Sequence, residues 1–344
     1  MTEQKKAGAL SSLAGVSVSR RRFLAGAGAA AGALASAGLA APAIAQSRPK
    51  AKIGYWPIAG GLAFFAAVER GYFADAGVDV EPVRFAGPNQ VVEAIISGRI
   101  DGSATGTAST ALALGDAQDP GSIRLFCMNF ANAEHVLDHV IAPRDSAVTS
   151  ISEFAGKRFA CGPGVNNVTL ARAILEKAGI PNPKVTELPG TQILPAMAAG
   201  QIDGAYVLEP TAVIGRNKGI SKIVETAVVS KYVLGDPMAP WLGGAASLSG
   251  AFVKENPAAA RAVVAGYARG VDHVREAGLD ANQYLKGYTA IEEDLQRDVP
   301  VSGYRMTSEM SEADWAAMQK LFDLFYERKV VPQKLNAAGM ALKL

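Results

Sequence analysis

Aromatic and polar side chains directly follow predicted strands, where they could line one edge of a sheet. Tyr55 and Trp56 end a short apolar run, and Thr105 and Thr107 follow an Ile-Asp-Gly sequence at residues 100–102. Aromatic rings can stack on a solute, while hydroxyl and indole groups hydrogen-bond to it. No nucleophile with an adjacent base and no pair of carboxylates can be assembled from these loops. The residue types therefore favour binding of a small molecule over catalysis.

A Gly-x-Ile-Asp-Gly pattern occurs twice, at residues 98–102 and 200–204. In each copy a helical stretch precedes the first glycine, which can take the left-handed conformation after a helix end. Similar strand and helix patterns lie upstream of both copies, so each half predicts a β-α-β-α-β unit. Parallel strands joined by helical crossovers place their carboxyl-end loops at one edge, where ligands bind. Two such units predict two lobes with a cleft between them.

The repeat relates the two halves residue by residue. Thr107 and Glu209 each lie six residues after the aspartate of their own copy. One lobe would then offer a hydroxyl group and the other a carboxylate to a solute in the cleft. The glycine turns Phe85-Ala-Gly-Pro-Asn89 and Leu188-Pro-Gly-Thr-Gln192 also correspond, and their last residues are further binding candidates.

The clearest predicted helix of the second half begins after the Gly-Pro-Gly sequence at residues 162–164. Its free backbone N–H groups could bind an anion or a carbonyl, and its first asparagines could alternatively cap the helix. No arginine falls in the predicted loops, so the charge of the solute stays open. Trp241, in the predicted return crossing between lobes, could cover the solute or pack in the core. The predicted ligand-binding residues are Tyr55, Trp56, Asn89, Thr105, Thr107, Asn166, Asn167, Thr169, Gln192, Glu209 and Trp241.

Residues 1–45 are predicted to be an export signal and not part of the fold. Arg20-Arg-Arg-Phe-Leu24, an Ala/Gly-rich run and Ala43-Ile-Ala45 are typical of a twin-arginine signal cleaved near Ala45. Cleavage would remove five basic side chains and one acidic side chain, which changes the formal net charge from +2 to −2. Without a basic cluster, the mature chain is not expected to bind nucleic acid. The expected product is a monomer in the periplasm.

Cysteine and histidine give little support for disulfide or metal chemistry. Cys127 and Cys161 fall in or beside apolar runs and are expected to be buried and reduced. His135 and His139 could share one face, but no third ligand accompanies them, so no metal site is predicted. The glycines at residues 26–32 belong to the predicted signal, and no other phosphate-binding motif occurs. We therefore expect no cofactor and no catalytic residue.

The order of the predicted elements divides the chain into two lobes. Apolar runs at residues 123–130 and 135–142 are expected strands that cross between lobes, and residues 241–247 are the expected return crossing. The amphipathic segments at residues 257–275 and 312–329 need a core to cover, and the simplest topology returns them to the first lobe. The predicted division is a discontinuous lobe I at residues 46–135 plus 245–344, and lobe II at residues 136–244.

These features together resemble a known family. The export signal, Lys52-Ile-Gly-Tyr-Trp-Pro57, the doubled Gly-x-Ile-Asp-Gly and Leu208-Glu-Pro210 are similar to substrate-binding proteins of ABC importers, in the nitrate/sulfonate/taurine group. The resemblance covers nearly all of residues 50–335. It implies the type II periplasmic-binding-protein fold, an α/β architecture in which each of two lobes is a mostly parallel sheet flanked by helices.

The same resemblance implies a function. A small polar organic solute, similar to a sulfonate, a carboxylate or a heteroaromatic compound, would be captured between the lobes and delivered to a membrane permease. Two alternatives stay open. One is an enzyme of the same fold, similar to pyrimidine-precursor synthases or dehydratases, although the cysteine-rich motif of those synthases is missing here. The other is a ligand sensor for a membrane receptor.

Overall fold

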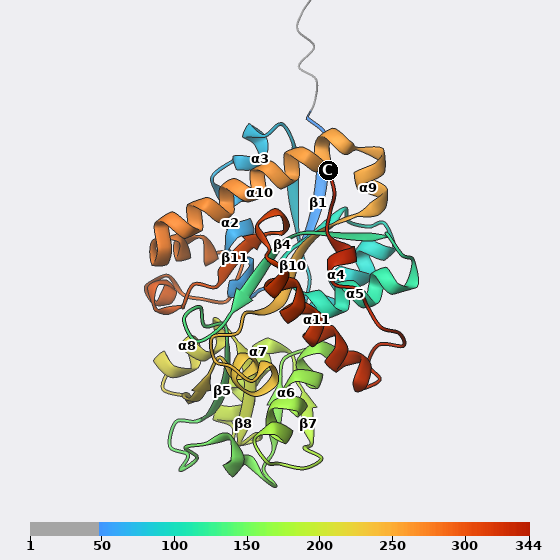
Figure 1. Cartoon of the computed structure of the whole chain (residues 1–344). Coiled ribbons are helices and arrows are strands. Elements are labelled where there is room, and N and C mark those ends of the chain that lie inside the picture. The colour runs from blue at the N-terminus through green and yellow to red at the C-terminus, as the bar shows by residue number, and fades with distance from the viewer. Residues whose placement is uncertain (1–47) are drawn as a thin grey trace, which may run out of the picture. The chain divides into compact units, whose positions relative to one another are not determined.

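The computed structural model of this protein describes residues 48–344, and the predicted export signal lies outside them. The described chain forms two mixed β-sheets, each flanked by helices (Figure 1). The elements around the first sheet are called lobe I below, and those around the second sheet lobe II. The α/β fold class predicted from the sequence is confirmed.

Lobe I contains a six-stranded sheet in the order β11-β4-β10-β3-β1-β2. Strands β1, β2 and β3 are parallel neighbours, whereas β10 runs antiparallel to both β3 and β4. The strands are β1 (Lys50–Tyr55), β2 (Asp79–Arg84), β3 (Gly102–Ala108), β4 (Ile123–Ala131), β10 (Trp241–Ser249) and β11 (Gly303–Met306). The helices are α2 (Leu62–Glu69), α3 (Tyr72–Asp75), α4 (Pro88–Ile96), α5 (Ser109–Gln118), α9 (Gly250–Glu255), α10 (Pro257–Ala277) and α11 (Glu312–Glu327).

Lobe II contains a five-stranded sheet in the order β7-β6-β8-β5-β9. Strands β6, β7 and β8 are parallel, and β5 runs antiparallel to β8 and β9. In both sheets the three strands of a β-α-β-α-β unit lie in the order second, first, third. An antiparallel strand pairs with the third of them. The strands are β5 (Asp138–Pro143), β6 (Phe159–Cys161), β7 (Val185–Glu187), β8 (Gly204–Leu208) and β9 (Ser221–Thr226), and the helices are α6 (Val165–Lys177), α7 (Gly190–Ala198) and α8 (Thr211–Asn217).

The aspartate of the doubled Gly-x-Ile-Asp-Gly pattern makes the same contact in both lobes. Asp101 Oδ2 accepts a hydrogen bond from the backbone N–H of Lys52, and Asp203 Oδ2 accepts one from that of Arg158, each at 2.8 Å. The Arg158 guanidinium also donates to Asp203 and lowers the pKa of that carboxyl to about 2. Each aspartate thus ties the start of the third strand to the first strand. Both aspartates are therefore structural residues at the entry to a strand.

Two segments carry the chain between the lobes. Residues 132–137 lead from β4 to β5, and residues 235–240 lead from a π-helical turn (Val229–Leu234) back to β10. The backbone N–H of Ala133 donates to the carbonyl of Pro237 at 2.8 Å, so the two crossings are hydrogen-bonded to each other. The predicted strands in this region are present, but the crossings are the loops beside them. β4 pairs only within the sheet of lobe I and β5 only within that of lobe II, so the chain passes between the lobes in the residues that separate them.

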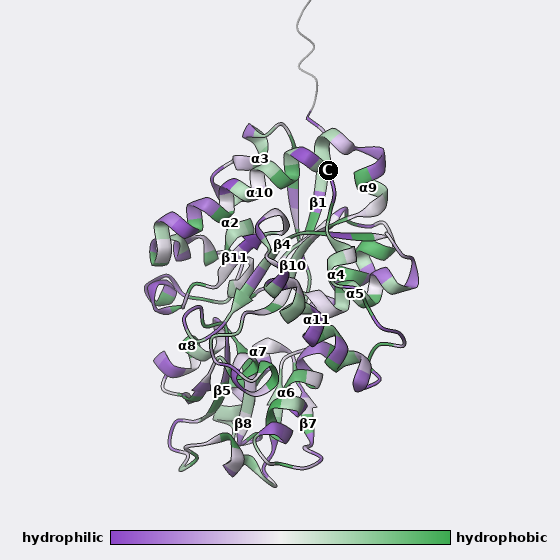
Figure 2. Ribbon diagram, in the orientation of Figure 1, coloured by the Kyte–Doolittle hydropathy of each residue, from purple (hydrophilic) through white to green (hydrophobic). Residues whose placement is uncertain are grey.

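The long C-terminal helices pack on lobe I, as their amphipathic pattern predicts. Buried residues of α10 belong to the cluster that contains Phe64 and Phe126 of lobe I, and buried residues of α11 belong to this cluster and to a second one around Leu112. Figure 2 shows hydrophilic stretches along both helices. Ser311 Oγ accepts from the backbone N–H of Asp314 at 3.2 Å, and the Asp314 carboxylate accepts from that of Ser311 at 2.9 Å. These two hydrogen bonds form a capping box at the start of α11.

Candidate functional site

A cavity of about 750 Å³ lies between the two lobes. Its walls come from the loops that follow β1 and β2 in lobe I and β6, β7 and β8 in lobe II. These are carboxyl ends of parallel strands, where ligands bind in open α/β sheets, and the volume suits a small molecule. The large apolar residues on the wall are Trp56, Ile58, Phe85, Ile193, Leu194, Tyr206, Val207, Leu208, Ile214 and Ile220.

The charged side chains on the cavity wall are both basic. They belong to Arg84, the last residue of β2, and to Lys218, and no carboxylate from residues 48–344 lies on this wall. Lys218 Nζ lies 2.6 Å from Glu292 Oε1. Arg84 has no ion-pair partner within the described part of the chain. Arg84 is not among the predicted binding residues, because it is the last residue of a strand and not part of a predicted loop.

A smaller recess of about 20 Å³ adjoins the cavity. Trp56, Ile58, Asn167 and Leu208 line both spaces, so the recess and the cavity share a wall. Trp241 lines the recess with only 3% of its surface exposed, and its Nε1–H has no hydrogen-bond partner among the described residues. The recess is therefore lined by residues of both lobes, and one of these residues has an unused donor.

Four of the predicted ligand-binding residues lie at this site. Trp56 and Asn167 line the cavity and the recess, whereas Asn166 and Trp241 line the recess. Trp56 Nε1–H donates to the carbonyl of Gly106 at 2.8 Å, which fixes the indole ring. Asn166 accepts a hydrogen bond from the Thr110 hydroxyl of lobe I, so it also joins the two lobes.

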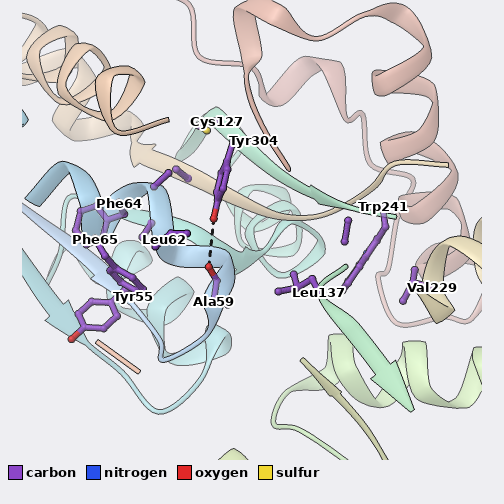
Figure 3. Close-up of a cluster of buried hydrophobic side chains, with 14 of the residues drawn as sticks. Tyr55, Ala59, Leu62, Phe64, Phe65, Cys127, Leu137, Val229, Trp241 and Tyr304 are labelled. Carbon is purple, nitrogen blue, oxygen red and sulfur yellow. Dashed lines mark hydrogen bonds between the residues drawn. The ribbon is translucent and has the colours of Figure 1, made fainter. Parts of the chain in front are cut away.

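Tyr55 lies next to Trp56 in the chain but packs into the core of lobe I. Its ring centroid lies 5.4 Å from that of Phe65 and 5.5 Å from that of Tyr288, and Figure 3 shows it beside Phe64 and Phe65. Burial raises the pKa of its hydroxyl group. Successive side chains of an extended chain point to opposite sides, so only one of these two aromatic residues can face the cavity.

The predicted threonines make contacts inside the protein. Thr105 uses its backbone N–H and its hydroxyl for two 2.8 Å hydrogen bonds with the Tyr267 hydroxyl. Thr107 is fully buried, and its Oγ1 has no partner within residues 48–344. Thr169 Oγ1 donates to the carbonyl of Val165 in its own helix at 2.7 Å. None of the three lines the cavity or the recess.

The two glycine turns contribute to the cavity through their earlier residues. Phe85 and Ala86 line the wall in lobe I, and residues 189–191 line it in lobe II. Asn89 lies farther along, inside α4 and close to Gly164, and Gln192 is exposed in α7. The sequence identified both turns correctly. The sequence did not show that the cavity wall already begins at the last residue of the preceding strand.

Glu209 is fully buried and turned away from the cavity. Its Oε1 lies 2.8 Å from His139 Nε2, and its Oε2 accepts a hydrogen bond from the backbone N–H of Val213 at 3.2 Å. Its backbone carbonyl accepts from the N–H of Ala59 in lobe I at 3.0 Å. Glu209 therefore connects the lobes through its backbone, while its side chain belongs to the interior of lobe II.

The carboxyl group of Asp138, next to His139, should make stability depend on pH. Burial raises its pKa to about 6, although the backbone N–H of Val229 and the nearby His139 act in the opposite direction. An unfolded aspartate loses its proton near pH 3.9, so the folded state binds the proton more tightly and stability falls as pH rises from about 4 to about 6. The loss would be about 3 kcal/mol. We expect Asp138→Asn to gain about this much relative to the wild type between pH 4 and pH 8, measured by urea unfolding.

Titrating groups that do not interact with Asp138 cancel in this comparison, because both proteins contain them. A stability difference that stays constant over the whole pH range would contradict the raised pKa of the buried Asp138 carboxyl group. Asp236→Asn, at an exposed position of the return crossing, serves as a control for the substitution of aspartate by asparagine.

Within residues 48–344, no three or more His, Cys, Asp or Glu side chains are grouped so that they could hold a metal ion. Cys127 and Cys161 are buried and free, as expected, and burial raises the pKa of the Cys161 thiol to about 12. No helix in the described part of the chain is long and apolar enough to cross a membrane.

Solved structures with the same fold include binding proteins from three bacteria. The alkanesulfonate-binding protein SsuA of Xanthomonas axonopodis pv. citri, bound to MOPS, has a TM-score of 0.69 and 16% identity, over 87% of this chain and 100% of that one. The periplasmic aliphatic sulphonate-binding protein SsuA of Escherichia coli has a TM-score of 0.67 and 16% identity, over 86% and 98%. The periplasmic nitrate-binding protein NrtA of Synechocystis PCC 6803 has a TM-score of 0.65 and 14% identity, over 85% of each chain.

These identities are low, so the structural likeness establishes the periplasmic-binding-protein fold and no more. No protein with a curated description matches the sequence. The NMT1/THI5-like family model matches residues 61–277, which is more than half of the chain. This protein therefore belongs to the NMT1/THI5-like family.

Proposed function

We propose that this protein is the periplasmic solute-binding component of an ABC importer. The observation that carries the proposal is the cavity of about 750 Å³ between the lobes, lined by carboxyl-end loops of both sheets. The fold it shares with sulfonate-binding and nitrate-binding proteins supports the same function. The predicted twin-arginine signal would place the protein in the periplasm, where a permease in the inner membrane is the partner.

Two ion pairs between the lobes, both partly exposed to solvent, suit a cavity that opens and closes. Lys218 reaches Glu292 and Arg328 reaches Glu176, both at 2.6 Å and both across the two lobes. Ion pairs that are partly exposed to solvent contribute about 0–1 kcal/mol each. Such weak contacts can break and re-form, so residues 46–135 plus 245–344 would move as one body against residues 136–244 when a solute enters.

The chemistry of the wall favours an organic acid of moderate size. Apolar residues form most of the surface, and the charged side chains are both cationic. A sulfonate or a carboxylate with a hydrocarbon or heteroaromatic body would match both properties. A bare inorganic ion would leave most of the apolar wall without contact. An enzymatic role receives less support, because the wall carries no carboxylate, cysteine or histidine from the described residues that could act as acid, base or nucleophile.

A thermal-shift screen of the mature protein tests the proposal. The panel contains alkyl and aryl sulfonates, the matching carboxylates, amines and neutral heteroaromatics. A solute that binds only the folded state stabilises it by about 2.7 kcal/mol at a hundredfold excess over its Kd, which raises the melting temperature by several degrees. We expect acids to produce this shift and amines to produce none.

Isothermal titration of each hit should then give a stoichiometry of one. Arg84→Gln provides the site control, and Arg99→Gln, at an exposed position outside the cavity, provides the matched control. If no compound of a broad panel shifted the melting temperature of ligand-free protein, the proposed function would be untenable.

A further inference from the structure

The recess beside the cavity contains hydrogen-bond donors that the protein does not use. Trp241 Nε1–H has no partner within the described chain, although 97% of the residue is buried. Asn129 accepts from the backbone N–H of Gly106 through Oδ1, which leaves its Nδ2 group without a partner there. The donors come from β4 and β10, both in lobe I. Both residues line the same small space, and no charged residue of the described chain lines it.

The size of the recess limits what these donors can bind. About 10–15 Å³ suffices to hold one water molecule, and the recess measures about 20 Å³. A single water molecule or a single acceptor atom fits, whereas the three oxygen atoms of a sulfonate group do not. A ligand group that reproduces the hydrogen bonds of such a water can displace it without loss of affinity.

The positively charged side chain of the site that has no ion-pair partner within residues 48–344 does not lie at the recess. Arg84 is on the wall of the main cavity and does not line the recess. Between them lies Trp56, which lines both spaces and is held by its hydrogen bond to Gly106. The site therefore separates a neutral donor group from a positive charge by an apolar surface.

We infer that the solute carries two separate anchoring groups joined by an apolar body. This inference rests on the proposed function and specifies its substrate class. One group is an uncharged acceptor, a carbonyl oxygen or a ring nitrogen, which enters the recess and accepts from Trp241. The other is an anion, a carboxylate or a sulfonate, which stays in the main cavity opposite Arg84. The apolar body lies against Trp56 and Phe85.

A matched series of compounds tests the two anchors one at a time. Para-acetylbenzoate carries both groups, para-isopropylbenzoate lacks the acceptor, and methyl para-acetylbenzoate lacks the anion. The same three substituents on a biphenyl body extend the distance between the groups. A site that leaves a buried donor unpaired rejects the analogue without the acceptor, so we expect at least about tenfold weaker binding of the isopropyl acid by isothermal titration.

Two variants assign each preference to its residue. Trp241→Phe should abolish the preference for the acetyl acid over the isopropyl acid, because it removes the N–H group and keeps an aromatic ring. Arg84→Gln should abolish the preference for the acid over its methyl ester. Trp315→Phe and Arg99→Gln, which do not line either space, should leave both preferences intact.

The outcomes separate the two proposals. If acids bind and the acetyl compounds of both lengths bind no better than the isopropyl compounds, the two-anchor inference is overturned while solute capture stands. The same holds if Trp241→Phe leaves the preference unchanged. If nothing in this series or in the broader panel binds, solute capture itself is contradicted.

Discussion

Glu209→Ala is expected to destabilise the folded protein by about 3–5 kcal/mol. The substitution removes one partner of a buried pair, Oε1 of Glu209 and Nε2 of His139 at 2.8 Å, and leaves the imidazole in a space closed to water. It also removes the acceptor for the backbone N–H of Val213. Chemical denaturation at neutral pH measures the change. Glu209→Gln keeps an acceptor oxygen and should cost less, about 1–3 kcal/mol.

The same variants distinguish the structural role of Glu209 from a binding role. Glu276→Ala, at an exposed position near the end of α10, is the matched control and should change stability by no more than about 0.5 kcal/mol. An acid that binds the wild type should bind folded Glu209→Gln with nearly the same Kd. Full stability of Glu209→Ala combined with loss of binding would mean that this carboxylate contacts the solute instead.

The β-α-β-α-β scaffold of both lobes was predictable because the Gly-x-Ile-Asp-Gly pattern occurs once in each lobe. Asp101 and Asp203 must each reach a backbone N–H of the first strand, so the Ile-Asp-Gly sequence recurs wherever this strand entry is built. The helices that follow their own periodic pattern, such as α6 and α11, also lie close to the predicted positions. At these places the local sequence pattern and the tertiary structure favour the same element. The sequence was therefore sufficient to predict these elements.

The site was predicted only in part, because the direction of a side chain depends on where a strand ends. Tyr55 and Trp56 are adjacent aromatic residues, and nothing in the sequence shows which of them faces the core. Arg84 counts as a strand residue by its pattern, yet its side chain is on the cavity wall. Glu209 follows β8 by a single residue and turns inward to His139, a partner on the neighbouring strand. Such partners come from tertiary contacts that one sequence does not reveal.

Trp56→Ala is expected to reduce affinity for an acidic solute at least about a hundredfold and to destabilise the protein by about 3–5 kcal/mol. The indole lines the cavity and the recess, so its removal merges the two spaces and takes away the apolar surface between them. The residue is 9% exposed, and truncation of a buried tryptophan leaves a void that the surroundings fill only partly. Titration of an acid from the panel gives the affinity, and urea unfolding gives the stability.

Two further variants separate the effect on binding from the effect on folding. Trp56→Phe keeps a ring but loses the N–H that donates to Gly106, so it should cost about 1 kcal/mol of stability and less than about tenfold in affinity. Trp315→Ala removes a partly buried indole from α11, away from the cavity, and should lower stability without changing Kd. If the alanine variants at both positions lost affinity equally, the loss would follow from weakened folding. A loss confined to Trp56 means that the ring which separates the cavity from the recess also positions the solute across them.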